Sequence, residues 1–382
     1  MKSFKIAAAC LPLILLAACA QGPVHQDETV FYPPLPQTPR VQFLTGFTTE
    51  DEFAGRSNRF RDFLLGGDTD ESKSLARPFS IAHRPGEIII ADKTYHTIVF
   101  VDLEAREFNA LSEVAGRMML DPVSVFITPN GELLVADSQR NQVFVFNERN
   151  EYVGEYGDGT TFRPLDAVVY GDRVYVADLN ASEVEVLDRA TGEVIDVISS
   201  IGSADGQLNK PTHLALDAAG NLFVTDSFNL RLQMFDPQGE FVKVIGWNVR
   251  GPGGLARPKG LDVDRDGHLY IADVAFQVIQ IFSVETRDAL LYFGKAGQGP
   301  GGNHMPSDVH IDYDNVKYFQ EFAHPQFEIE YLIYVGNLLG DKRLNVYGFG
   351  RWTGDSEDSA PAPPGAGDGE SVDPSSTAPG TG

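Results

Sequence analysis

The strongest constraint on the fold of this chain is a unit that recurs along the sequence with the same internal spacing. Each copy opens with a proline, passes through a short turn, and ends in an apolar run closed by Ala-Asp or Thr-Asp. The five clear copies are Pro78 to Asp92, Pro122 to Asp137, Pro164 to Asp178, Pro211 to Asp226, and Pro258 to Asp273. The proline and the aspartate lie 14 or 15 residues apart in every copy, and chance does not keep such a register.

A sixth, degenerate copy opens at Pro306 and reaches YLIYVGN, with Asn337 at the position of the aspartate. Its proline and asparagine are 31 residues apart, so about sixteen residues have been inserted into this copy. The inserted stretch, 313–330, is rich in aromatic residues and falls between the first two β runs of the unit.

Each unit contains alternating β runs separated by Gly, Asn and Asp turns, and a helical period is absent from its sequence. Four antiparallel strands repeated about every 41–48 residues predict a β-propeller, in which each sheet buries both faces against its neighbours. We therefore expect an all-β fold of six four-stranded blades within residues 40–352. The blades open near residues 77, 121, 163, 210, 257 and 305.

The sixth copy has only three β runs before the end of the repeat region, the last being RLNVYGFG at 343–350. A separate β run, RVQFLTGF at about 40–47, precedes the first copy. We expect this run to be the fourth strand of blade six, because it then closes the ring and leaves no open sheet edge.

The N-terminus has the pattern of a secretory signal peptide over residues 1–18: Lys2 and Lys5, then an apolar run too short to span a membrane comfortably. The run ends in Leu-Ala-Ala followed by Cys19, which resembles a bacterial lipobox. The resemblance implies acylation of Cys19 and sorting to the outer membrane, on its periplasmic or outer surface. Ordinary cleavage after Ala20 is the alternative.

The segments that flank the repeat region are polar and rich in proline. Residues 19–39 are predicted to be an extended tether between the lipid and the propeller. Residues 353–382 contain acidic, Pro, Gly and Ser residues with almost nothing to bury, and are predicted to be disordered.

The chain is strongly acidic, with a formal net charge of −24. This charge argues against nucleic acid as a partner. Its only two cysteines are Cys10 and Cys19, both in the N-terminal segment, so we expect no disulfide in the mature protein.

The repeats resemble NHL repeats, in which a proline is followed by a Gly-Asn turn, a hydrophobic-Val-Ala-Asp run and Asn-x-Arg. The best match is KPTHLALDAAGNLFVTDSFNLRLQMFDPQGEFVKVIG at 210–246, and the resemblance covers about residues 77–350. The arginine of the pattern remains only as Arg231. As a whole, the chain resembles bacterial six-bladed NHL-repeat lipoproteins.

The sequence DVDRDGHLYIAD at 262–273 begins like a calcium-binding loop. It occupies the position of ALDAAGNLFVTD in blade four, so the Asp-Gly pair is expected to be the hairpin turn between the first two strands. The repeated aspartates, such as Asp273, are expected to accept backbone N–H bonds in the turn after the second strand.

The positions that differ between repeats are better candidates for function. Two residues after each opening proline stand Ser80, Ser124, Asp166, His213, Gly260 and Asp308. We expect these residues to ring one mouth of the central channel. Asp166, His213 and Asp308 are then candidates to bind a divalent cation there, although a hydrated polar pore is the simpler interpretation.

The insertion in blade six is expected to project from the opposite face of the ring. Its aromatic residues Tyr318, Phe319, Phe322 and Phe327 are candidates for a partner surface. The alternative is that they fold back and cap the ring.

We expect a non-catalytic scaffold of the bacterial cell envelope, anchored by lipid, that binds an envelope or extracellular protein or a ligand. NHL propellers resemble such modules, and no set of nucleophile, base and orienting residue recurs in the sequence. One alternative is a metal-dependent lactonase- or lyase-like enzyme, because related six-bladed propellers hold a divalent ion at the channel mouth. A second is an accessory component of an extracellular electron-transfer or export assembly.

Overall fold

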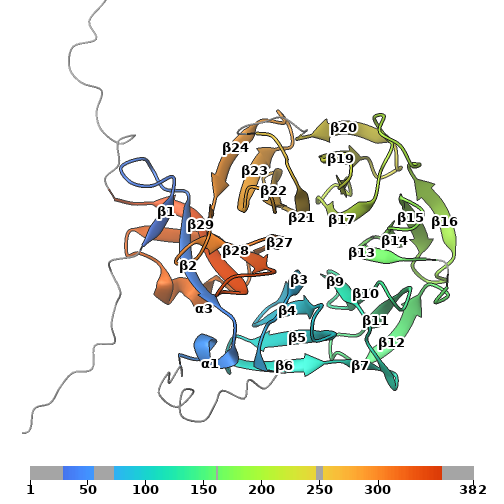
Figure 1. Ribbon diagram of the computed structural model, residues 1–382, viewed down its shortest axis with the longest axis horizontal. Helices are drawn as coiled ribbons and strands as arrows, with labels where there is room; N and C mark the ends of the chain where they lie inside the picture. The colour runs from blue at the N-terminus through green and yellow to red at the C-terminus, as the bar shows by residue number, and fades with distance from the viewer. Residues whose placement is uncertain (1–28, 56–72, 161, 247–252, 355–382) are drawn as a thin grey trace, which may run out of the picture.

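The computed structural model describes residues 29–55, 73–160, 162–246 and 253–354. The predicted signal peptide, Cys19 and the acidic tail from residue 355 lie outside these residues. The described chain forms six blades arranged around a central axis, which confirms the predicted propeller (Figure 1).

Every blade has its strands in the same radial order. The innermost strands are β3 (Pro78–Arg84), β9 (Pro122–Ile127), β13 (Pro164–Tyr170), β17 (Pro211–Leu216), β21 (Pro258–Val263) and β27 (Pro306–Asp312). The second strands are β4 (Glu87–Asp92), β10 (Leu133–Asp137), β14 (Arg173–Asp178), β18 (Leu222–Asp226), β22 (His268–Asp273) and β28 (Phe327–Asn337). The third strands are β5 (Thr97–Asp102), β11 (Gln142–Phe146), β15 (Glu183–Asp188), β19 (Arg231–Phe235), β23 (Val278–Ser283) and β29 (Leu344–Trp352). The outer strands are β6 (Glu107–Leu111), β12 (Tyr152–Tyr156), β16 (Val194–Ile198), β20 (Phe241–Ile245), β24 (Ala289–Phe293) and β2 (Val41–Phe47).

The remaining elements are short. They are helices α1 (Glu50–Phe53) and α3 (Val316–Phe319), the 3₁₀ turn η3 (Gln320–Phe322), strand β1 (Val30–Tyr32), hairpin β7 (Glu113–Val114) and β8 (Arg117–Met118), and the parallel pair β25 (Lys295–Ala296) and β26 (Gly302–Asn303). None of the helices in the described part of the chain has the length and apolar composition needed to cross a membrane.

The hydrophobic core lies between the blades. Each cluster of buried apolar side chains in the described chain is formed mainly by two neighbouring sheets, as where Phe223 and Leu232 of blade four pack with Ile271 of blade five. The second strands are buried on both faces, and β10, β18 and β28 show this most clearly. This two-sided burial explains why their sequences are runs of Val, Ile, Leu, Phe and Tyr without polar alternation.

The ring closes as predicted. Strand β2 pairs antiparallel with β29, with Val41 opposite Phe349 and Phe47 opposite Leu344. The segment expected to be a tether differs from the prediction, because Val30–Tyr32 forms strand β1 on the outer edge of β2. Phe31 is buried there among aromatic rings, and the added strand pairs the edge that β2 would otherwise leave open.

The repeated aspartates have the expected role in turns and a second one. The buried Asp92 carboxylate accepts N–H bonds from Thr94 (3.0 Å) and Tyr95 (3.2 Å) in the turn after β4. It also accepts N–H bonds from Ala76 (2.7 Å) and Arg77 (2.9 Å), just before the opening proline. One carboxylate therefore fixes both the entry to the blade and its second turn.

In blade six, an asparagine stands in place of the repeated aspartate. Asn337 stands opposite Pro306, as the aspartates stand opposite their prolines. Its Oδ1 accepts the N–H of His304 at 2.9 Å, whereas its buried Nδ2 has no hydrogen-bond partner in the described chain. An amide supplies one acceptor where the carboxylate supplies two.

The calcium-like sequence is a turn, as predicted. Asp264 Oδ1 accepts the N–H groups of Asp266 (2.9 Å) and His268 (2.8 Å) between β21 and β22. Gly267 has a φ of +79°, a conformation that glycine adopts without strain.

Asp92→Asn tests the importance of the repeated carboxylate. The amide can accept only part of the four bonds, so buried backbone N–H groups lose their partners and the free energy of unfolding should fall by about 2–4 kcal/mol. Asp102→Asn is the matched control, because Asp102 accepts two N–H groups of an exposed turn in the same blade. Urea unfolding measures both, and equal losses would contradict this role for Asp92.

Candidate functional site

The central channel contains a cavity of about 930 Å³ that is lined by the innermost strands of all six blades. The lining runs from Asp166 and Asp308, near the start of their strands, to Pro85, Pro129 and Ala218 in the turns that follow first strands. The cavity therefore extends to the face that carries the turns between first and second strands. We call this face the turn face, and the opposite one, with the loops that join the blades, the connection face.

An aromatic contact narrows the channel toward the connection face. Phe79 of blade one stacks on His213 of blade four, with ring centroids 6.3 Å apart and an interplanar angle of 22°. Blades one and four lie on opposite sides of the ring, so this contact crosses the channel axis (Figure 1). The cavity therefore extends from this contact toward the turn face.

The residues predicted to ring a channel mouth lie at the inner end of the cavity, toward the connection face. Ser80, Ser124, Asp166, His213 and Asp308 are all buried, with exposed fractions between 2% and 8%. All of them except Ser124 line the cavity, and Ser124 donates its hydroxyl to Asp166. Gly260 at the equivalent position has no room for a side chain, since a Cβ there would lie 2.0 Å from Asp308 Oδ1.

Three of these polar side chains join neighbouring blades. The inner edge of each first strand faces the channel, where its N–H groups have no neighbouring strand to bond. The contacts are Ile81 N–H to Asp308 Oδ2 (2.8 Å), Val125 N–H to Ser80 Oγ (3.2 Å) and Leu214 N–H to Asp166 Oδ2 (2.7 Å). A structural role therefore accounts for these buried polar groups.

Burial changes the acid–base properties of the same groups. Desolvation raises the pKa of Asp166 to about 6 and that of Asp308 to about 7, against the hydrogen bonds that each carboxylate accepts. Desolvation, helped by the charge of Lys259, lowers the pKa of His213 to about 3, so this ring is neutral.

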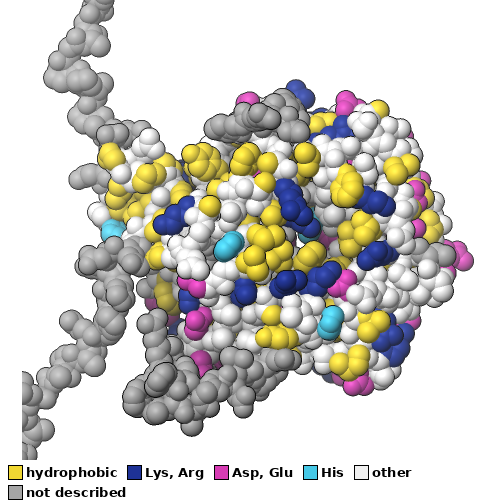
Figure 2. Space-filling view, viewed as in Figure 1, with side chains coloured by type: hydrophobic (Ala, Val, Ile, Leu, Met, Phe, Trp, Pro, Cys, Tyr) yellow, Lys and Arg dark blue, Asp and Glu magenta, His cyan; other side chains and the backbone are white. Residues whose placement is uncertain are grey.

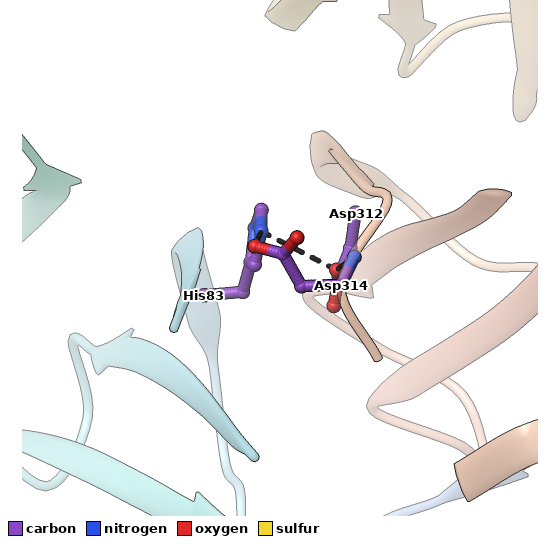
Figure 3. A group of neighbouring side chains, drawn as sticks. All are labelled: His83, Asp312 and Asp314. Atoms are coloured by element: carbon purple, nitrogen blue, oxygen red, sulfur yellow. Dashed lines mark hydrogen bonds and ion pairs between the residues drawn. The ribbon is translucent and has the colours of Figure 1, made fainter. Parts of the chain in front are cut away.

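The structure does not bring Asp166, His213 and Asp308 together as one set of metal ligands. Two groups in the described chain could hold an ion. One is Asp264, Asp266 and His268 in the calcium-like turn, and the other is His83, Asp312 and Asp314, of which His83 and Asp314 line the cavity. His83 on β3 reaches toward blade six, where Asp312 ends β27 and Asp314 follows in the turn (Figure 3). His83 Nε2 lies 3.3 Å from Asp312 Oδ1 and 3.4 Å from Asp314 Oδ2.

A second histidine extends this group into the channel. His83 Nδ1 and His310 Nε2 are 2.8 Å apart, so one ring donates an N–H hydrogen bond to the other. His310 Nδ1 lies 3.1 Å from Asp262 Oδ2. Burial opposes the charge of His310, but the bond to Asp262 and the surrounding carboxylates raise its pKa, whereas burial and the charge of His310 lower the pKa of His83.

His310 and His83 were not predicted as site residues, for two different reasons. His310 stands two residues after Asp308, and its partner Asp262 stands two residues after Gly260. Side chains two residues apart on a strand point to the same side. Extending the predicted polar layer by one step would have found them. His83 stands three residues after Ser80, so the strand pattern does not place it in the polar layer. Only the contact between blades one and six brings it to His310.

The aromatic insertion folds back on the ring, which was the alternative expectation. Phe319 in α3 and Phe327 in β28 are buried, and Phe319 packs against Tyr334 in the core between blades six and one. Tyr318 is half-buried and lies under the Lys317 ammonium. Only Phe322 is exposed, at 37%, so these four residues do not form a continuous aromatic partner surface.

Asp308→Asn tests the buried carboxyl at the inner end of the cavity. A carboxyl whose pKa is raised in the folded state makes the protein less stable as the pH rises from about 4 to about 7. The variant lacks this loss, so its unfolding free energy relative to the parent should be higher at pH 8 than at pH 4.5, by about 3 kcal/mol. Urea unfolding at both values measures it. Asp341→Asn, at an exposed site, should show no pH-dependent difference, and an equal response would contradict the raised pKa.

Comparison with known proteins supports the fold. A family model described as a 6-bladed beta-propeller matches residues 205–291, which contain blade four and most of blade five. No curated protein sequence matches the chain.

Solved structures with a similar fold have low sequence identity to this chain. A Bacteroides thetaiotaomicron protein of unknown function is 14% identical with a TM-score of 0.58, over 81% of this chain and 75% of the other. Virginiamycin B lyase from Staphylococcus aureus is 14% identical with a TM-score of 0.48, over 63% of this chain and 75% of the other. Kuenenia stuttgartiensis hydrazine synthase is 15% identical with a TM-score of 0.47, over 73% of this chain and 97% of the other. At 14% identity, the likeness to the Bacteroides thetaiotaomicron protein concerns the fold alone.

Proposed function

We propose that this protein is a non-catalytic binding propeller whose ligand occupies the cavity on the turn face. The observation that carries the proposal is the cavity itself: about 930 Å³, lined by all six blades. Sites for small molecules are concave, largely preformed and of about this size. Of the two kinds of partner expected from the sequence, a protein or a ligand, the cavity favours a small ligand.

The chemistry of the cavity favours a ligand with an apolar body and a cationic group. The walls include Val125, Val168 and Leu216, whereas the region near blade six carries carboxylates. Asp262, Asp312 and Asp314 surround the pair of His83 and His310, so carboxylates outnumber histidines here and favour a positively charged ligand group. An amine of the ligand would offset that excess.

A metal-dependent enzyme is the second candidate, favoured by the group of His83, Asp312 and Asp314. With a divalent ion on His83 Nε2, the Nδ1–H of His83 would donate a hydrogen bond to His310 Nε2, and the Nδ1–H of His310 would donate one to Asp262. Such an outer hydrogen bond is typical of metal-bound histidine. Asp312 fits less well, because its two oxygens already accept four hydrogen bonds. This saturation is why an organic ligand is proposed first.

The proposal places the propeller in the bacterial envelope, held by a lipid on Cys19 and with no role for nucleic acid. The support is the lipobox-like sequence and the net charge of −24. The full chain should fractionate with membranes and take up labelled palmitate, whereas Cys19→Ala should do neither. Uptake of the label by the variant would contradict the assignment of Cys19.

Benzylamine is a suitable probe for the cavity, with benzyl alcohol as its uncharged match. We expect benzylamine to raise the melting temperature of the protein in a saturable way and benzyl alcohol to do so less, because only the amine meets the carboxylates. Asp314→Asn should weaken benzylamine binding roughly three- to tenfold, since this half-exposed carboxylate contributes a screened ion pair.

Asp341→Asn is the matched control, at an exposed aspartate away from the cavity lining, and should leave binding unchanged. Equal binding of the amine and the alcohol, or no effect of Asp314→Asn, would contradict the proposed ligand chemistry. A rise in melting temperature with manganese chloride that Asp314→Asn abolishes would favour the metal-dependent candidate instead.

A further inference from the structure

The connection face carries positive charge although the chain as a whole is acidic. Figure 2 shows Lys and Arg side chains gathered around the central opening of one face. The repeat explains such a ring, because the residue before the opening proline takes the same place in every blade. That position holds Arg77, Asp121, Arg163, Lys210, Arg257 and Met305 in blades one to six.

Two ammonium groups lie over the Phe79 ring, and the charge of a third cation, Arg257, acts on one of them. The ammonium groups of Lys93 and Lys259 lie 5.2 Å and 5.3 Å from the centre of the Phe79 ring. Burial, together with the charges of Arg257 and Lys93, lowers the pKa of Lys259. Lys93 and Phe79 belong to blade one, and Arg257 and Lys259 to blade five, so the fold brings like charges together from separate blades.

Two of these cations have no counter-charge among the described residues. Lys93 forms an ion pair with Asp121 at 3.0 Å. In the same part of the chain, no carboxylate lies within 4.0 Å of the side-chain nitrogens of Arg257 or Lys259. The chain has 54 acidic residues, yet among those described only Asp121 pairs with one of the three cations, and the repulsion between the cations costs stability. A cluster of cationic side chains that repel one another is typical of a site where a bound anion supplies the counter-charge.

We propose that Phe79, Lys93, Arg257 and Lys259 form a binding site for a small multivalent anion, of the phosphate or dicarboxylate class, on the connection face. The anion would lie between the two lysines and the guanidinium of Arg257, beside the edge of the Phe79 ring. A small anion fits better than a polyanion, because the surrounding charge of −24 repels a long negatively charged chain.

This site is separate from the cavity of the proposed function. Neither Phe79 nor any of the three cations lines the cavity, and the contact between Phe79 and His213 divides the two ends of the channel. The anion site can therefore be right or wrong independently of the ligand on the turn face.

The test is calorimetric titration of the full chain with sodium phosphate and with disodium succinate, at an ionic strength held constant with sodium chloride. We expect saturable binding of at least one anion at neutral pH. Lys259→Gln should weaken it at least tenfold, because it removes the cation nearest to the others. Lys295→Gln, which removes an exposed lysine in β25, is the matched control and should leave binding unchanged.

A second measurement separates the loss of the site from a folding defect. In sodium chloride alone, Lys259→Gln should melt at the same temperature as the parent or higher, because it relieves repulsion, and Lys259→Arg should retain most of the binding. Binding of phosphate alone or succinate alone would assign the anion class. The proposal is overturned if neither anion exceeds the effect of chloride, or if Lys259→Gln and Lys295→Gln behave alike.

Discussion

The ring depends on a buried carboxylate at the end of the second strand of a blade. In blades one, two and five this group accepts N–H bonds both from the loop before the opening proline and from the turn that follows its own strand. Two chain segments that are 14 or 15 residues apart are thereby held side by side. The proline fixes where the innermost strand begins. The same bonds therefore determine where along the channel axis the residues of each blade lie.

Closing six sheets into a ring leaves the inner edge of every first strand facing the axis. The N–H groups of these edges need acceptors, and side chains of the adjacent blade supply several of them, Asp166 and Asp308 among them. The polar layer predicted from the repeat is thus largely a consequence of ring closure. The contacts proposed for a ligand lie one step further along the strands, where Asp262 and His310 meet His83.

The two faces of the ring differ in charge. Turns between the first and second strands carry Asp172, Asp217, Asp266 and Asp314, while the loops that join the blades carry Arg77, Arg163, Lys210 and Arg257. The fold therefore sorts opposite charges along the channel axis, and Phe79 and His213 separate them at its centre. A net charge alone would not reveal this polarity, because it averages the two faces.

The sequence by itself determined the number of blades, the strand that closes the ring and the role of the repeated aspartates, because each depends on spacing along the chain. It also indicated an inner polar layer, but not that Phe79 and His213 meet across the channel beside it or that the cavity extends to the opposite face. Those features, the burial of Phe319 and Phe327, and the meeting of His83 with His310 were decided only by the tertiary structure. The physical reason is that they depend on which blades become neighbours or face each other across the axis, and a repeat spacing carries no information about contacts between its copies.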